Sequence, residues 1–196
     1  MITRSITTHN IKINLKATET HLKGCFILEP TIFKDDRGYF FESYNELKLE
    51  QILGYKPQFV QDNQSKSGYG VIRGLHMQAG DFSQAKLVRV LEGAVLDVVV
   101  DVRKDSETFG ESFSIELTAE NNKQLFIPKG FLHGFSVLSD EAVFFYKCDD
   151  FYNKESEAGI NPLDKGLNID WKIAEDKMIL SEKDTDAPEF SELFKR

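Results

Sequence analysis

Short segments in which apolar and polar residues alternate dominate this chain, and turn residues separate them. Alternation with a period of two places every second side chain on one face, which is typical of a β-strand with one buried face. In the middle of the chain the pattern predicts strands at residues 58–62, 71–77, 85–91, 94–102, 112–117, 124–127, 134–138 and 142–148. Earlier strands are predicted at 11–16, 25–33 and 39–44.

One segment before the C-terminal third has a clear helical pattern. It covers residues 45–53, where Asn45 can cap the start and Gly54 can end the helix. Many short strands with few helices favour an all-β fold, an antiparallel β-sandwich or jelly-roll barrel with a few short peripheral helices. Residues from 153 onward are more polar, and we expect them to pack outside the barrel. No repeat or linker divides the chain, so residues 1–196 are predicted to form one domain.

Composition narrows the classes of function. The formal net charge of −8 argues against nucleic-acid or anionic-membrane binding, which requires a basic surface. No apolar run reaches the ~20 residues that span a bilayer, and the N-terminus lacks the apolar core of a signal peptide. Cys25 and Cys148 lie in separate apolar runs, where buried, reduced thiols are expected. We therefore predict a cytoplasmic protein that holds any anionic ligand in a local basic pocket.

The segment 71–90 carries the residues best suited to chemistry. His76 follows Arg73 within one predicted strand, and Lys86 begins the next. Histidine has the side-chain pKa best suited to proton transfer near neutrality, and a neighbouring cation can stabilise the anion that forms when a proton leaves. Charged side chains that point into a barrel are unfavourable unless they are paired or serve a ligand. Taken alone, His76 would more often be a structural histidine of a sheet. Beside Arg73, Lys86 and the remaining motifs given below, a catalytic role is favoured.

A second cluster reads Pro128-Lys129-Gly130-Phe131-Leu132-His133-Gly134-Phe135 and resembles the second motif of cupin jelly rolls. The first cupin motif would carry His-x-His and a later glutamate, whereas this chain has His76-Met77-Gln78 and Lys86 there. An ammonium group among the ligands would repel a divalent cation. A catalytic metal is therefore not expected.

Seven motifs in order resemble the dTDP-4-dehydrorhamnose 3,5-epimerase family, over about residues 24–188. They are Arg37-Gly38-Tyr39-Phe40-Phe41-Glu42, Gln61-Asp62-Asn63-x-Ser65, Arg73-Gly74-Leu75-His76, Lys86-Leu87-Val88-Arg89-Val90, Ile127-Pro128-x-Gly130-Phe131-x-His133-Gly134-Phe135, Tyr146-Lys147 and Leu180-Ser181-Glu182-Lys183-Asp184. The resemblance implies a cupin fold and an isomerase without metal or redox cofactor. Its substrate would be dTDP-4-keto-6-deoxy-D-glucose, inverted at C3 and C5 to give dTDP-4-keto-L-rhamnose for dTDP-L-rhamnose and polysaccharide biosynthesis.

The resemblance also assigns catalytic roles. It implies that His76 is the base, that Lys86 stabilises the enolate, that Tyr146 is the acid on the opposite face, and that Asp184 orients the base. Taken singly, Tyr146 could be a core aromatic residue and Asp184 a solvated turn residue. His133 could support the pocket or only hydrogen-bond a turn.

The resemblance further implies a homodimer formed by strand exchange. Arg37 and Glu42 would complete the nucleotide pocket of the partner subunit, and Arg73 would bind the diphosphate within its own subunit, because guanidinium groups bind such oxygens bidentately. The remaining substrate-binding candidates are Gln61 and Asn63 for the sugar or phosphates, His133 for the pocket, and Phe40 or Phe151 for stacking on thymine.

Two features depart from the family pattern. A tryptophan that commonly precedes Asp-Pro is absent from Gly159-Ile160-Asn161-Pro162, and residues 1–10 form an N-terminal extension without an assigned role. Rival functions stay open: a C3-only epimerase or a ketoisomerase acting on a related nucleotide sugar, a non-catalytic sugar-nucleotide-binding cupin, and a metal-dependent cupin oxygenase.

Overall fold

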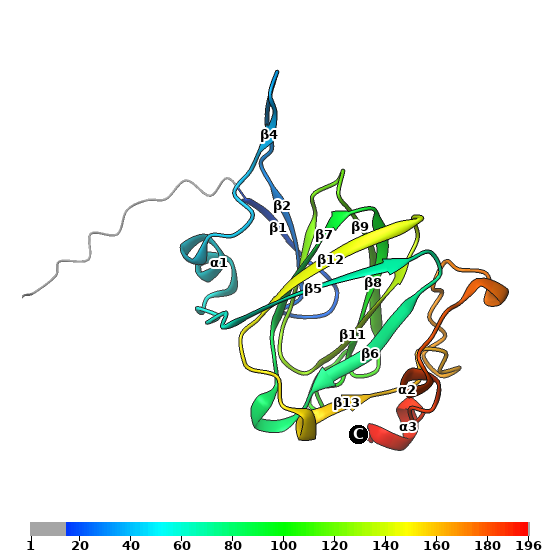
Figure 1. The fold of residues 1–196 in the computed structure, drawn as a ribbon. Helices are drawn as coiled ribbons and strands as arrows, with labels where there is room; N and C mark the ends of the chain where they lie inside the picture. The colour runs from blue at the N-terminus through cyan, green and yellow to red at the C-terminus, as the bar shows by residue number, and fades with distance from the viewer. Residues whose placement is uncertain (1–14, 196) are drawn as a thin grey trace, which may run out of the picture.

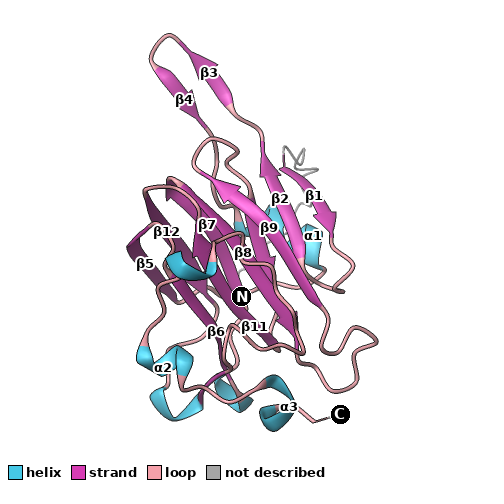
Figure 2. Ribbon diagram, turned by 90° about the vertical axis from the view of Figure 1, so that its right-hand side faces the viewer, coloured by secondary structure: helices cyan, strands magenta, loops and turns pink. Residues whose placement is uncertain are grey.

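Two antiparallel β-sheets face each other in the computed structural model, which describes residues 15–195 (Figure 1). The six-stranded sheet has the order β1-β2-β10-β7-β12-β5, and the five-stranded sheet has the order β13-β6-β11-β8-β9. A separate hairpin, β3–β4, projects from one end of the sandwich, whereas α2 and α3 lie at the other end (Figure 2). The predicted all-β jelly-roll architecture with short peripheral helices is confirmed.

The elements have the following bounds. The six-stranded sheet contains β1 (Leu15–Glu19), β2 (Phe26–Pro30), β10 (Gln124–Ile127), β7 (Lys86–Glu92), β12 (Glu141–Cys148) and β5 (Gln61–Gly68). The five-stranded sheet contains β13 (Glu157–Gly159), β6 (Ile72–Gln78), β11 (Phe131–Val137), β8 (Ala94–Asp101) and β9 (Ser112–Thr118). The hairpin is β3 (Phe33–Asp35) and β4 (Gly38–Phe40), and the helices are α1 (Glu46–Leu53), α2 (Glu182–Thr185) and α3 (Phe190–Leu193), with short 3-10 turns at Gly80–Phe82, Lys154–Ser156 and Glu175–Lys177.

The main hydrophobic core lies between the two sheets. Val88 on β7 and Phe144 on β12 pack with Val99 on β8 and Phe135 on β11, and all four are buried. The Phe135 and Phe144 rings stack with their centroids 4.3 Å apart. Burying one such side chain stabilises a fold by about 1.5–3 kcal/mol, so this core supports the polar cavity that Phe135 and Phe144 also line.

The C-terminal part covers the outer face of the five-stranded sheet, as the sequence predicts. Trp171 is 1% exposed and belongs to a cluster with Leu75 and Leu132, and its Nε1 donates to the Pro162 carbonyl oxygen at 2.8 Å. In the turn that lacks the usual tryptophan, Asn161 Nδ2 donates to the Thr185 carbonyl oxygen at 3.1 Å. Asn161 therefore ties this turn to α2.

Helix α1 covers the outer face of the six-stranded sheet. Its Leu49 is buried in a cluster with Leu87 and Phe126. The Asn45 side chain accepts from the Lys48 amide, and Gly54 adopts φ 75° at the C-terminus. Glycine takes this left-handed conformation without the steric penalty of a Cβ atom. The predicted helix and both of its end residues are therefore confirmed.

Some strand bounds differ from those predicted. Strand β5 runs from Gln61 to Gly68 rather than over 58–62, the segment 25–33 divides between β2 and β3, and β11 begins at Phe131 rather than at 134. In β5 the inward residues are polar, so no apolar alternation marks the strand. Residues 11–14 of the first predicted strand and the extension, residues 1–10, lie outside the described residues.

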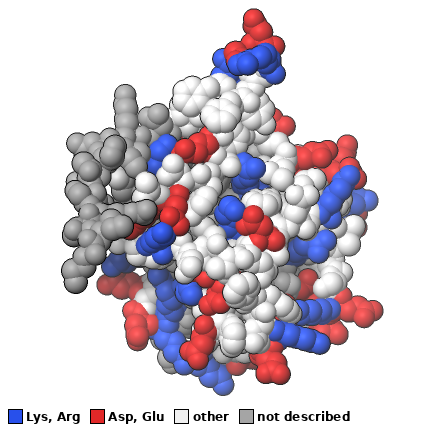
Figure 3. All heavy atoms as spheres, turned by 60° about the vertical axis from the view of Figure 1, so that its left-hand side comes forward, with Lys and Arg blue, Asp and Glu red and all other residues white. Residues whose placement is uncertain are grey.

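The structure also shows the state of the two cysteines and the distribution of surface charge. Cys25 and Cys148 are both free and buried, as predicted. No helix in residues 15–195 is long and apolar enough to cross a membrane. On the face shown in Figure 3, acidic and basic side chains are interspersed, and no broad basic patch is visible.

Candidate active site

A cavity of ≈ 800 Å³ lies between the two sheets. One wall is formed by β5, β7 and β12, the other by β6 and β11, and the segment around α2 lies beside β6. Eight of the predicted site residues line this cavity: Gln61, Asn63, Arg73, His76, Lys86, His133, Tyr146 and Asp184. The fold thus brings together residues from positions 61 to 184.

His76 and Asp184 form a hydrogen-bonded pair. Ser181 caps α2 by accepting from the Asp184 amide, and the short helix directs Asp184 toward β6. His76 Nε2 lies 2.5 Å from Asp184 Oδ1, with 32% of the histidine side chain exposed but only 6% of the aspartate side chain. A buried carboxylate on one ring nitrogen fixes the orientation of the imidazole and increases its basicity. The predicted contact between these residues is present.

Glycine residues make room for this pair. A Cβ atom on Gly159 in β13 would lie 2.8 Å from His76 Cδ2, so only a hydrogen fits beside the ring. A Cβ on Gly74, which has φ +119°, would lie 2.6 Å from the Gly134 Cα on β11. The glycines of the Arg73-Gly74-Leu75-His76 and His133-Gly134-Phe135 motifs therefore allow β6 and β11 to approach each other.

Lys86 and Tyr146 belong to neighbouring strands of the opposite wall. Lys86 Nζ lies 5.8 Å from the centre of the Tyr146 ring. Burial lowers the pKa of Lys86, although nearby negative groups, including Asp97, act in the other direction. Burial also raises the pKa of the Tyr146 hydroxyl, which Arg73 partly counteracts. Tyr146 therefore keeps its proton at neutral pH and can act as an acid.

The cavity can perform proton transfer on two faces of one molecule. His76 lies on β6 of the five-stranded sheet, and Tyr146 lies on β12 of the six-stranded sheet, with the cavity between them. Lys86, on the same wall as Tyr146, supplies a positive charge. A base and an acid on facing walls, with a cation beside them, suit the removal of a proton from one face of a carbon and its return on the other.

The cavity wall also carries hydrogen-bonding groups on β5 and β6. Gln61 Nε2 donates to Asn63 Oδ1 at 3.1 Å on β5. Arg73 Nε donates to Ser67 Oγ at 3.0 Å, and the two terminal nitrogens of its guanidinium make no hydrogen bond within residues 15–195. Both terminal guanidinium nitrogens of Arg73 are therefore available to an anion in the cavity.

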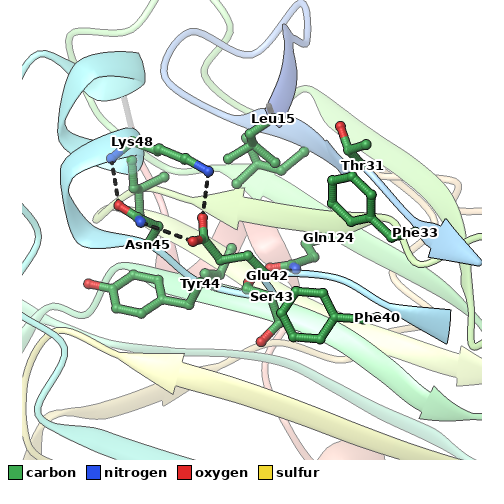
Figure 4. A pocket seen from close by; sticks show the side chains of 13 residues that line it. Leu15, Thr31, Phe33, Phe40, Glu42, Ser43, Tyr44, Asn45, Lys48 and Gln124 are labelled. Atoms are coloured by element: carbon green, nitrogen blue, oxygen red, sulfur yellow. Dashed lines mark hydrogen bonds and ion pairs between the residues drawn. The ribbon is translucent and has the colours of Figure 1, made fainter. Parts of the chain in front are cut away.

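Four predicted residues do not line this cavity. Arg37 lies at the hairpin tip, paired with Asp35 at 2.5 Å, and Phe40 is 69% exposed on β4. Glu42 lies in a separate pocket of ≈ 190 Å³, where its carboxylate accepts from Lys48 (Figure 4). Phe151 is 63% exposed after β12. Their predicted binding roles stay predictions.

The sequence motifs predict no role for several other residues in or behind the cavity. Glu157 on β13 pairs with Lys183 at 2.6 Å and accepts from the Tyr152 hydroxyl at 3.2 Å, and all three residues line the cavity. Asp97 lies behind His133 on β8, with His133 Nε2 2.8 Å from Asp97 Oδ2. Asp97 could be recognised from the sequence, because it is an aspartate among the valines of a predicted core strand. Buried carboxylates are rare without a specific partner.

The donor set around the cavity is unlike a metal centre. No group of three or more His, Cys, Asp or Glu side chains that could hold a metal ion occurs within residues 15–195. His76 and His133 are directly opposite each other on β6 and β11, but each already contacts a carboxylate of its own.

Comparisons with known proteins identify the family. A family model described as dTDP-4-dehydrorhamnose 3,5-epimerase matches residues 19–192. The chain is 48% identical over 176 residues to the dTDP-4-dehydrorhamnose 3,5-epimerase of Shigella flexneri, covering 90% of this chain and 96% of that protein. The crystal structure of this epimerase from Elizabethkingia anophelis is similar, with a TM-score of 0.90, 58% identity and coverage of 93% and 100%. The structure of the Legionella pneumophila epimerase in complex with dTDP-4-keto-L-rhamnose matches with a TM-score of 0.87 and 46% identity, covering 93% of this chain and 98% of that chain. This chain belongs to the dTDP-4-dehydrorhamnose 3,5-epimerase family.

Proposed function

We propose that this chain converts dTDP-4-keto-6-deoxy-D-glucose to dTDP-4-keto-L-rhamnose by inverting C3 and C5. The observation that carries the proposal is the placement of His76 and Tyr146 on facing walls of one cavity. Inversion needs proton removal and proton return on opposite faces of the carbon, and a single residue on one wall would return the proton to the face from which it came.

The steps follow from the residues around the cavity. His76 takes the proton from the carbon beside the ketone, and the electron pair of the C–H bond moves into the ring to give an enolate at the C4 oxygen. The ammonium of Lys86 stabilises that oxygen. Tyr146 then gives its proton to the carbon from the other side, and the ketone re-forms. The net change is one inverted centre, one proton gained by His76 and one lost by Tyr146, which solvent restores.

Asp184 supports the base in this sequence of steps. Its carboxylate holds His76 Nε2 and stabilises the imidazolium that forms after proton transfer. Arg73 is assigned to the diphosphate, and Gln61 and Asn63 to the sugar or phosphate oxygens. These assignments rest on the position of each residue at the cavity and on the free donors of Arg73.

We further propose that the protein acts as a homodimer. The β3–β4 hairpin projects from the sandwich, and below its charged tip it presents uncharged atoms (Figure 3). Phe33, Tyr39 and Phe40 on this hairpin are 54%, 62% and 69% exposed. An isolated two-stranded hairpin with exposed aromatic side chains is marginally stable in water, so a second copy is its expected support. Arg37 and Glu42 would then reach the partner's nucleotide pocket.

Subunit mixing tests this arrangement directly. Arg37→Ala and His76→Ala should each be nearly inactive alone, because each dimer then lacks one group at both sites. Mixing them in equal amounts, with subunit exchange, should restore about a quarter of the unmodified activity, since half of the dimers would each have one complete site. No recovery in mixtures shown to contain heterodimers would contradict the shared site.

Deuterium exchange tests the chemistry. In deuterated water, the unmodified protein should place deuterium at C3 and C5 of the sugar, with product stereochemistry followed by NMR. Tyr146→Phe should still exchange protons through His76 but form little inverted product, whereas His76→Ala should abolish exchange and retain dTDP binding. Deuterium at C3 alone would identify a C3-only epimerase, and absence of exchange in the unmodified protein would refute the proposed function.

We assign the reaction to dTDP-L-rhamnose biosynthesis in the cytoplasm. Two free, buried thiols are consistent with a reducing compartment, where disulfides are rare.

A further inference from the structure

A second histidine–aspartate pair lies beside the first. His133 on β11 is directly opposite His76 on β6 in the sheet register. Its Nε2 lies 2.8 Å from Oδ2 of Asp97 on β8. His133 is 7% exposed and Asp97 is fully buried. The proposed reaction uses the His76–Asp184 pair as its base and leaves Asp97 without a role.

Asp97 is an unfavourable residue for the fold alone. Its Oδ1 is buried and accepts no hydrogen bond from any residue in the part of the chain that the structure describes. An unpaired buried carboxylate oxygen loses its hydration without compensation, and apolar residues of similar volume are often more stabilising than buried ions. A buried carboxylate oxygen without a hydrogen bond, on a strand of valines, calls for a functional explanation such as an electrostatic effect on neighbouring groups.

Lys86 depends on a negative charge near it. Its Nζ makes no hydrogen bond or ion pair within residues 15–195, and burial lowers its pKa. Three groups act against this effect: Cys148, Asp97 and Glu157. Burial raises the pKa of the Cys148 thiol to about 11, so it is uncharged at neutral pH, and Glu157 is paired with Lys183 at 2.6 Å. Asp97 is therefore the buried carboxylate whose charge most directly supports the Lys86 ammonium.

The dependence is mutual. Burial raises the pKa of Asp97, and the positive charges of His133 and Lys86 lower it. Asp97 thus acts on two cavity groups, His133 and Lys86, that can donate to a substrate oxygen. His133 Nδ1 has no hydrogen-bond partner within the described residues, and the ring lines the cavity.

We propose that Asp97 is a positioning residue for stabilising the enolate. It accepts the Nε2–H of His133 and stabilises this ring as an imidazolium, so that Nδ1–H also donates to the C4 oxygen of the sugar. It also keeps Lys86 an ammonium ion at the same oxygen. Two donors would then share the charge that develops when the proton leaves carbon. This inference rests on the proposed function, and it adds Asp97, which lies outside the motifs of the sequence, to the groups that control the reaction.

Asp97→Asn tests the proposal, because the amide keeps the shape and removes the charge. We expect kcat to fall by roughly 10²-fold, as for the loss of one oxyanion donor, with the Kd for dTDP little changed. The basic limb of the kcat profile should move toward lower pH by about one unit or more, because Lys86 loses a nearby negative charge. Unchanged kcat, or a lower kcat with an unmoved basic limb, would overturn the proposal.

Two further variants separate positioning from structure. If Asp97 acts through Lys86 and His133, adding Asp97→Asn to Lys86→Met should reduce kcat far less than it does in the unmodified protein. Full additivity would contradict this. Ser136→Ala is the matched control, because Ser136 is a buried polar residue on β11 whose hydroxyl donates to the Trp171 carbonyl at 2.7 Å. It should lower Tm without moving the pH profile.

A measurement on the unmodified protein covers the case in which Asp97→Asn does not fold. Nitrogen-15 NMR of the His133 ring at pH 7 should show protons on both ring nitrogens, with Nε2–H donated to Asp97 and Nδ1–H available to the substrate. An unprotonated Nε2 or Nδ1 would overturn the proposal. Failure of the proposed function would appear separately, as absent deuterium exchange in the unmodified protein.

Discussion

Replacing Gly159 by alanine should impair catalysis by displacing the His76 ring. An alanine Cβ at this position would lie 2.8 Å from His76 Cδ2 and 3.0 Å from the Leu75 carbonyl oxygen. Carbon atoms make favourable contact at about 3.5 Å or more, so the ring must retreat by about 0.7 Å. The strand has less freedom to move, because the Leu75 carbonyl accepts from the Ile160 amide at 3.0 Å.

The size of the effect follows from this displacement. The ring is held by a 2.5 Å contact with Asp184, and a shift of most of an ångström lengthens that contact or misdirects the free ring nitrogen. Misplacement by about 1 Å can reduce a rate by about 10²-fold. We therefore expect Gly159→Ala to lower kcat by roughly 10- to 100-fold, about 1.4–2.7 kcal/mol in the barrier. Overpacking should also reduce the free energy of unfolding by about 1–3 kcal/mol.

Three measurements check this reasoning: kcat from the rate of product formation, deuterium exchange at C3 and C5, and the Kd for dTDP by calorimetry. Exchange should slow in parallel with kcat, while the Kd stays close to that of the unmodified protein. Gly68→Ala is the control, because its Cβ would make an ordinary 3.7 Å contact with the Asp140 carbonyl oxygen, and it should leave kcat unchanged. A kcat for Gly159→Ala within twofold of normal, in a folded protein, would refute the argument.

Three further predictions concern charge and thiols. Burial acts to raise the pKa of Asp101, but hydrogen bonds from Arg103 and two hydroxyls outweigh it and lower the pKa to about 2. Asp101→Asn should therefore reduce the free energy of unfolding at pH 7 by about 2 kcal/mol, a deficit that shrinks as the pH falls from about 4 to about 2 in urea titrations. Burial lowers the pKa of Lys86, so the ammonium should be lost, and kcat should fall, at a pH below the usual lysine pKa of ~10.4. Lys86→Arg should remove this decrease from the pH–rate profile, because arginine stays protonated. Burial raises the pKa of Cys25 to about 12 and that of Cys148 to about 11, so Ellman's reagent at pH 8 should label both thiols only after unfolding.

Apolar periodicity predicts the strands that pack in the core but not the strand that lines the cavity. Strands β7, β8, β10 and β12 lie close to their predicted positions, since most of their buried residues are apolar. The pattern predicts strand β5 several residues too early in the chain. Its residues that face the cavity, Gln61, Asn63 and Ser65, are polar, and the exposed residues of the strand are polar as well. A strand that is polar on both faces has ordinary β geometry, but it lacks the apolar alternation by which a strand is recognised in a sequence.

The amino-acid sequence by itself determines the architecture and the family, and it predicts which residues react. Local patterns specify strands and the capped helix, and the ordered motifs contain His76, Lys86, Tyr146 and Asp184. These properties are local or follow chain order, so no coordinates are needed to read them.

Only the tertiary structure decides how these residues act on one another. The packing of the two sheets places His76 and Tyr146 on opposite walls, and α2 returns Asp184 to within 2.5 Å of a histidine 108 positions earlier in the chain. The approach of β8 to β11 creates the His133–Asp97 pair, which no sequence motif marks. Distances and burial set the pKa of Lys86 and the orientation of each ring, and both depend on packing between segments that are remote along the chain.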